Sequence, residues 1–92
     1  MPVVKVPTQL RPLTEGAREV AVAAQTVEEL LATLEARYPG IRERLCEADG
    51  ALRPFISIYV GSEDIRLREG LATCLQPDDE IFIVPAMSGG ST

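Results

Sequence analysis

Short segments in which apolar and polar residues alternate predict the strands of this protein, because alternation turns one face of a strand toward the core. A first strand at residues 2–6 is rich in valine, and Pro7 ends it because proline has no N–H for the sheet ladder. The next alternating segment, residues 18–23, completes a hairpin with it. Further strands are predicted at residues 55–60 and 80–85, with a short edge strand at 65–67.

A period close to that of a helix appears between these strands and predicts a helix over residues 27–38. Thr26 is a good N-cap, and Glu29 three residues later completes a capping box. A proline and a glycine at 39–40 end this helix, and a short second helix is predicted up to about Gly50. The apolar face of the main helix consists of Val27, Leu30, Leu31 and Leu34.

The order of these elements predicts an α+β domain of the β-grasp (ubiquitin-like) type. One main helix in so short a chain can cover only one sheet, so the first and last strands must be neighbours. We expect a mixed sheet of four to five strands, covered by one main helix plus a short second helix. A ferredoxin-like βαββαβ fold is the alternative, because the segment after residue 40 could supply its second helix.

Length, composition and charge indicate one small globular domain. The chain has 92 residues, of which 46% are hydrophobic and 25% charged, and this is close to the globular average. Fourteen acidic against nine basic residues argue against a nucleic-acid partner, which needs clustered Lys and Arg. The start lacks signal-peptide features, and no apolar stretch approaches the roughly 20 residues of a membrane span. We therefore expect a cytoplasmic protein with no nucleic-acid or membrane partner.

No residues of this sequence form a recognisable catalytic motif. There is no histidine, the commonest general base and metal ligand near neutral pH. Cys46 and Cys74 have no CxxC spacing and cannot alone form a zinc site, so we expect free thiols. The acidic pairs at 63–64 and 78–79 lie in predicted turns, which aspartate favours. The glycines lack the spacing of a phosphate-binding loop. We expect no catalytic residue, no metal and no cofactor.

The end of the chain is its most unusual segment, because a hydrophobic strand is followed by small residues and the pair Gly89-Gly90. A diglycine has no side chains to clash, so it can pass through a narrow channel and present a carbonyl to another protein's active site. Such a segment is also typical of a disordered tail or an artificial extension. We expect residues 1–87 to form the β-grasp domain and residues 88–92 a flexible tail that carries the diglycine.

Seven segments, in order along nearly the whole chain, match one known family. They are VPTQLRP (6–12), TVEELL (26–31), YPGIRERL (38–45), FISIYV (55–60), EDIR (63–66), GLAT (70–73) and IVPAMSGG (83–90). With these segments the chain resembles the ThiS/MoaD group of β-grasp sulfur carriers, and within it the cysteine-biosynthesis sulfur carriers of actinobacteria. Each segment alone is weak, but together they are specific to the family, though not to one pathway.

The resemblance implies a carrier on which other enzymes act, not an enzyme. An E1-like enzyme would adenylate the C-terminal glycine with ATP, a sulfur donor would convert the acyl-adenylate to a thiocarboxylate, and a sulfur-accepting biosynthetic enzyme would take the sulfur. Gly90 is then the reactive residue and Gly89 its slender neighbour. Ser91 and Thr92 depart from the family pattern, so a protease, such as a metalloprotease of the JAB1/MPN type, would have to remove them first unless they are artificial.

The outward face of the sheet is the expected docking surface for these partners. In each of two strands, alternation gives one set of residues to the helix and the other to solvent. Several large apolar groups exposed together are typical of a partner-binding surface. Arg11 matches a Leu-Arg loop that lies near the enzyme in related complexes. The expected docking residues are Arg11, Tyr59, Phe82, Val84 and Met87.

An alternative function is a ubiquitin-like protein modifier, in which Gly90 forms an isopeptide bond with a lysine. A non-covalent β-grasp interaction domain is the other alternative. The sulfur carrier is the preferred interpretation, although the sequence does not separate it from the modifier, because both use the same activated glycine. Cysteine, thiamine, molybdopterin, tRNA and secondary metabolites are all candidate destinations for the sulfur.

Overall fold

The structure is a computed structural model that describes residues 1–86. Within this range the sheet has five strands, β1 (Val3–Lys5), β2 (Glu19–Ala21), β3 (Ile56–Val60), β4 (Glu63–Asp64) and β5 (Glu80–Pro85). Two α-helices, α1 (Val27–Arg37) and α2 (Ile41–Leu45), lie between β2 and β3 in the chain. The described residues also form the 3-10 helices η1 (Thr8–Thr14), η2 (Ile65–Leu67) and η3 (Gly70–Ala72).

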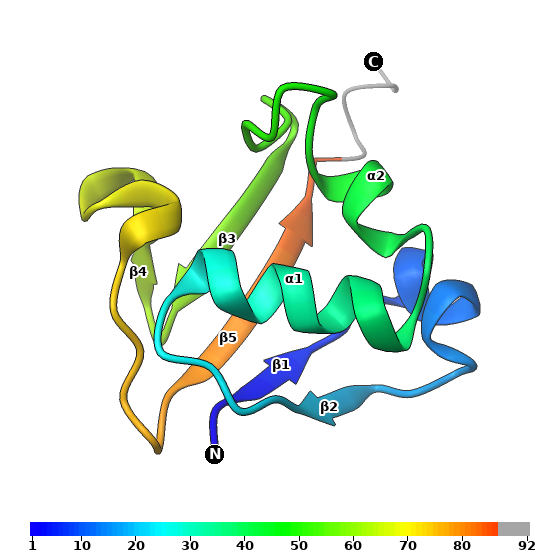
Figure 1. Cartoon of the computed structure of the whole chain (residues 1–92), viewed down its shortest axis with the longest axis horizontal. Coiled ribbons are helices and arrows are strands. Elements are labelled where there is room, and N and C mark those ends of the chain that lie inside the picture. The colour runs from blue at the N-terminus through cyan, green and yellow to red at the C-terminus, as the bar shows by residue number, and fades with distance from the viewer. Residues whose placement is uncertain (87–92) are drawn as a thin grey trace.

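The sheet is mixed, with the strand order β2-β1-β5-β3-β4 (Figure 1). The first and last strands, β1 and β5, are parallel neighbours at its centre, and all other pairs are antiparallel. Both helices lie on one side of the sheet and leave its other side uncovered (Figure 1). This arrangement is the predicted β-grasp fold, and the ferredoxin-like alternative is wrong because a hairpin precedes the first helix.

Local hydrogen bonds explain where the helices begin and end. The hydroxyl of Thr26 accepts the N–H of Glu29 at 3.2 Å, as predicted for an N-cap. The Glu29 carboxylate reaches one residue further back than in a standard capping box and accepts the N–H of Gln25 at 2.7 Å. The second helix ends at Leu45 and not near Gly50, because Cys46 leaves the helix and pairs with Leu52 in an isolated bridge.

The predicted edge strand at 65–67 is wrong, because these residues form η2. Asp64 accepts the N–H of Arg66 at 2.8 Å and so turns the chain, and Ile65 is buried in the core. The edge strand is instead Glu63–Asp64, which pairs with the end of β3. Between β1 and β2, most of residues 8–16 form η1.

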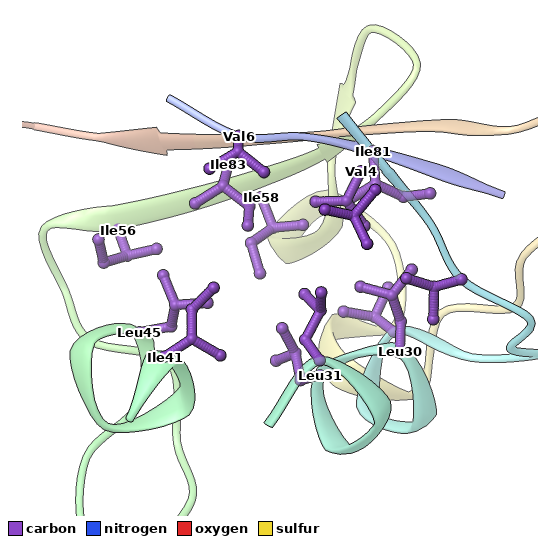
Figure 2. Packing of buried hydrophobic residues seen from close by; sticks show 14 of the residues in the cluster. Val4, Val6, Leu30, Leu31, Ile41, Leu45, Ile56, Ile58, Ile81 and Ile83 are labelled. Atoms are coloured by element: carbon purple, nitrogen blue, oxygen red, sulfur yellow. The ribbon is translucent and has the colours of Figure 1, made fainter. Parts of the chain in front are cut away.

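The core lies between the helices and the sheet. Figure 2 shows side chains of both layers pointing toward one another, with Leu30 and Leu31 of α1 opposite the strands. Large-to-small substitutions at such positions lower the free energy of unfolding by about 2–5 kcal/mol, so these contacts between the helices and the sheet stabilise the fold. The sheet contributes Val4, Val6, Ile56, Ile58, Ile81 and Ile83, and α2 contributes Ile41 and Leu45.

Candidate functional site

One row of side chains crosses the face of the sheet that the helices leave uncovered. Strand β5 lies between β3 and β1, and its residue Phe82 is paired with Tyr59 on β3 and with Lys5 on β1. The residues before and after each of them are buried or face the helices, so the row points to solvent. From β2 to β4 it consists of Glu19, Lys5, Phe82, Tyr59 and Asp64.

Tyr59, Phe82 and Val84 therefore lie on the outward face, as the alternation predicted. Val84 is 44% exposed and lies opposite Ser57, whereas Tyr59 and Phe82 are half-buried beside each other. The three side chains form a continuous apolar strip along β5, because Val84 follows Phe82 on the same face. Their role in docking stays a prediction.

Acidic groups surround the single lysine beside this strip. The Nζ atom of Lys5 is 2.6 Å from Oε2 of Glu19 and 3.9 Å from Oε2 of Glu80. The hydrogen bond with Glu19 raises the pKa of Lys5 above its ordinary value. Lys5 is the only lysine of the sequence. Its ε-ammonium group forms an ion pair with Glu19 at the edge of the apolar strip.

The last described residue, Ala86, is hydrogen-bonded to Phe55. The N–H of Ala86 donates to the carbonyl oxygen of Phe55 at 2.7 Å, so the ladder between β3 and β5 continues for one residue beyond β5. Phe55 is 50% exposed. The predicted docking residue Met87 and the tail residues Gly89, Gly90, Ser91 and Thr92 lie outside the described residues, and so does the boundary at residue 87.

Arg11 lies apart from the aromatic pair. It is in η1, which joins β1 to β2 at one edge of the sheet, whereas Tyr59 lies next to the opposite edge strand, β4. The Nε of Arg11 donates to the carbonyl of Val6 at 3.1 Å, and the Arg11 carbonyl accepts the N–H of Gly16 at 2.7 Å. These bonds hold the loop together, so Arg11 has a structural role whether or not it contacts a partner.

Arg66 organises the start of β3, a role that sequence analysis did not predict. Its Nη2 donates to the carbonyls of Ile56 at 2.6 Å and Arg53 at 3.2 Å, and its Nη1 donates to the hydroxyl of Ser57 at 3.3 Å. The short strand β4 pairs only with Tyr59 and Val60, so it leaves the first half of β3 as an open edge. The Arg66 guanidinium supplies hydrogen-bond donors to backbone carbonyls at that edge. Only the three-dimensional arrangement reveals this role.

The two cysteines are free thiols, as expected, but their surroundings differ. Cys46 is buried and Cys74 is exposed. Burial raises the pKa of the Cys46 thiol, which disfavours the nucleophilic thiolate. Among residues 1–86, no three metal-binding side chains are grouped so as to hold an ion. The helices of this described part are also too short or too polar to cross a membrane.

Comparisons with known proteins identify the family. The family model described as "ThiS family" matches residues 4–90. The sulfur carrier protein CysO of Mycobacterium tuberculosis is 43% identical over 89 residues, which cover 95% of this chain and 96% of the relative.

Solved structures agree with this assignment. A chain in the crystal structure of the Amycolatopsis orientalis BexX/CysO complex is 37% identical, with a TM-score of 0.91, over 98% of this chain and 100% of that one. The small archaeal modifier protein 1 of Methanosarcina acetivorans is 32% identical, with a TM-score of 0.84, over 97% and 95% of the two chains. The protein described here belongs to the ThiS family.

Proposed function

We propose that this protein is a sulfur carrier that holds sulfur as a thiocarboxylate on Gly90. The observation that carries this proposal is the ThiS family match, which runs to residue 90 and therefore ends on the second glycine of the pair. Relatives named as sulfur carrier proteins support it. The role of the folded domain is to be recognised, and other enzymes supply the chemistry. The two free thiols support a location in the reducing cytoplasm.

The proposed reaction needs a free carboxylate on Gly90. An E1-like enzyme joins a carboxylate oxygen to the α-phosphorus of ATP, and pyrophosphate leaves. The sulfur of a sulfide donor then attacks the carbonyl carbon of the acyl-adenylate, and AMP leaves with the oxygen that joined it to the carbonyl. On a sulfur-accepting biosynthetic enzyme the thiocarboxylate sulfur finally bonds to the acceptor, and water then hydrolyses the carbon–sulfur bond and restores the Gly90 carboxylate.

In the sequence as written, Ser91 follows Gly90, so the Gly90 carbonyl belongs to a peptide bond. Hydrolysis of this bond releases Ser91-Thr92 and leaves the carboxylate. A metalloprotease of the JAB1/MPN type is our candidate for this step. The proposed organisation is thus a rigid domain over residues 1–87 and a flexible tail over 88–92, whose diglycine enters the active sites of the partners.

The outward face of the sheet is the proposed docking surface for the adenylating enzyme. Tyr59, Phe82 and Val84 offer an apolar strip of the kind found at the centre of protein interfaces. Because β5 runs along this strip and ends at the base of the tail, a partner seated on the strip receives the tail directly. Arg11 and Met87 complete the set of proposed contacts.

The test compares two forms of the chain, one ending at Thr92 and one ending at Gly90. Each is incubated with a purified E1-like enzyme, ATP and sulfide, and its intact mass is measured. We expect only the form ending at Gly90 to exchange pyrophosphate into ATP and to gain the mass of an oxygen-to-sulfur replacement. Equal activation of both forms would contradict the processing step, and no thiocarboxylate on either form would contradict the carrier function.

Covalent attachment to proteins is the second candidate, favoured by the likeness to the archaeal modifier. In that case the activated Gly90 forms an isopeptide bond with a lysine of another protein. Attachment to another copy at a lysine would have to use Lys5, the only lysine, which is already paired with Glu19. The same mass measurement, made with a lysine-containing acceptor protein present, separates a thiocarboxylate from an adduct. A non-covalent interaction domain would give neither product.

A further inference from the structure

We propose that Phe55 is a contact for the adenylating enzyme that acts on Gly90, because Phe55 lies beside Ala86, the last described residue after β5. The inference rests on the proposed function, since it takes Gly90 as the reacting residue. Phe55 lies just before β3 and is not a member of the core cluster. Half of its surface is exposed, although large aromatic side chains usually contribute to a core.

The base of the tail is fixed to Phe55 by the backbone. Pro85 lies opposite Ile56 in the register of β3 and β5, and the next residue, Ala86, donates its N–H to the Phe55 carbonyl at 2.7 Å. The hydrogen bond from Ala86 extends this register by one residue, so that Phe55, just before β3, is the diagonal neighbour of Val84, and both side chains are exposed. The apolar strip therefore continues from Phe82 through Val84 to Phe55, which lies beside Ala86, the last described residue before the proposed tail.

The length of the tail limits how far from Phe55 an active site can be. Gly90 is four residues beyond Ala86, and an extended segment of this length spans at most about 14 Å. An enzyme that surrounds Gly90 therefore has its entrance close to Ala86 and covers the surface around Phe55. Phe82 lies four residues back along β5, about 13 Å further from the reacting carbonyl, so contact with it is not enforced by the tail.

The segment that carries Phe55 is held from both sides, so its side chain is presented by a fixed backbone. The guanidinium of Arg66 binds the carbonyls of Arg53 and Ile56, on either side of Phe55 in the chain. The guanidinium of Arg53 in turn donates to the carbonyl of Glu43 in α2, at 2.9 and 3.1 Å. A contact surface that is ordered before binding loses less entropy when the partner arrives.

The experiment uses the chain ending at Gly90 and the purified E1-like enzyme that activates it. Phe55→Ala is compared with Leu67→Ala, a matched control because Leu67 is 79% exposed and lies in η2, which follows the edge strand β4. The readout is the KM for the carrier in ATP–pyrophosphate exchange. We expect Phe55→Ala to raise this KM about tenfold, as loss of an apolar interface anchor does, and Leu67→Ala to leave it unchanged.

Two further measurements separate contact from folding. Hydrogen exchange of the Ala86 amide in Phe55→Ala reports whether the base of the tail is still anchored. Replacement of Phe55 or Leu67 by a photo-crosslinking phenylalanine analogue needs no truncation, and we expect crosslinks to the enzyme from position 55 only.

The inference is overturned if Phe55→Ala has the KM of the unmodified chain, if both substitutions raise KM equally, or if position 55 forms no crosslink. In each of these cases the unmodified chain is still activated, so the proposed function stands. If the unmodified chain ending at Gly90 is not activated, the proposed function fails, and the inference fails with it.

Discussion

Tyr59 on β3 and Phe82 on β5 are directly opposed across two antiparallel strands, on the side of the sheet that the helices leave uncovered. Aromatic cross-strand pairs stabilise a sheet, each contributing roughly 0.2–1 kcal/mol. This pair also shields part of each ring from water, since both side chains are half-buried. Substitution at either position can therefore change both binding and folding, and the two must be measured separately.

We predict that Tyr59→Ala and Phe82→Ala each weaken binding to the adenylating enzyme about thirtyfold, because truncation of an interface anchor costs about 2 kcal/mol or more. Val84→Asp, which places a charge in the same strip, has the same expected effect. Binding is measured by titration calorimetry and folding by the thermal midpoint. Variants that bind normally but melt early would show that these side chains stabilise the sheet and do not dock.

Arg66 is predicted to stabilise the domain through the carbonyls that it satisfies at the open edge of β3. Arg66→Ala removes hydrogen bonds from a charged donor to Ile56 and Arg53, so we expect a loss of about 1–2 kcal/mol in the free energy of unfolding. Arg68→Ala is the control, because Arg68 makes only an exposed ion pair with Glu63 at 3.6 Å among the described residues. Denaturant titration gives both values. A similar loss in both variants would assign the effect to charge and not to these bonds.

Most of the fold could be predicted from the sequence because its strands have one buried face. The last strand, Glu80–Pro85, begins and ends where predicted, and alternation placed Ile81 and Phe82 on opposite faces. Thr26 marked the start of α1 because an N-cap is a local interaction. Features that depend on residues close together in the chain could therefore be predicted without the structure.

The remaining features depend on residues far apart in the chain. The segment at 65–67 has the short apolar pattern of a strand, but the Asp64 side chain turns it away from the sheet. Arg66 can bind the Ile56 carbonyl because β4 is too short to pair with that part of β3, and no residue pattern indicates the length of β4. The link between Phe55 and the end of β5 is visible only in the structure, where the Phe55 carbonyl accepts the N–H of Ala86. Alternation assigned Tyr59, Phe82 and Val84 to the outward face correctly, whereas their role in docking stays a prediction.

Glu35 is predicted to make the stability of the turn between the two helices depend on pH. Its carboxylate accepts the N–H groups of Arg42 and Gly40, and these bonds lower the pKa of Glu35 below its ordinary value of 4.5. A lowered pKa in the folded state stabilises the protein above the unfolded pKa, and this contribution is lost as the pH falls through the folded value.

Glu35→Gln should therefore lower the thermal midpoint near neutral pH, and its difference from the unmodified protein should shrink as the pH falls below about 4.5. Glu43→Gln is the control, because the Glu43 carboxylate accepts no hydrogen bond within residues 1–86. Thermal melts across this pH range give the comparison. A difference that stays constant with pH would mean that the charge of Glu35 is not what stabilises the turn.

The reactive end of the tail is predicted to tolerate no side chain on Gly90. Gly90→Ala, in a chain ending at that residue, adds a methyl group next to the carboxyl carbon that must reach ATP. A displacement of about 1 Å from attack geometry costs on the order of 100-fold in rate, so we expect pyrophosphate exchange to fall by about that factor. The domain, whose described core consists of residues between Val4 and Ile83, should melt at the same temperature. Ser88→Ala is the matched control, two residues away from the reacting carboxylate, and should keep most of the activity. If Gly90→Ala is activated as fast as the unmodified chain, the requirement for glycine is wrong, and the carboxylate is not enclosed as proposed.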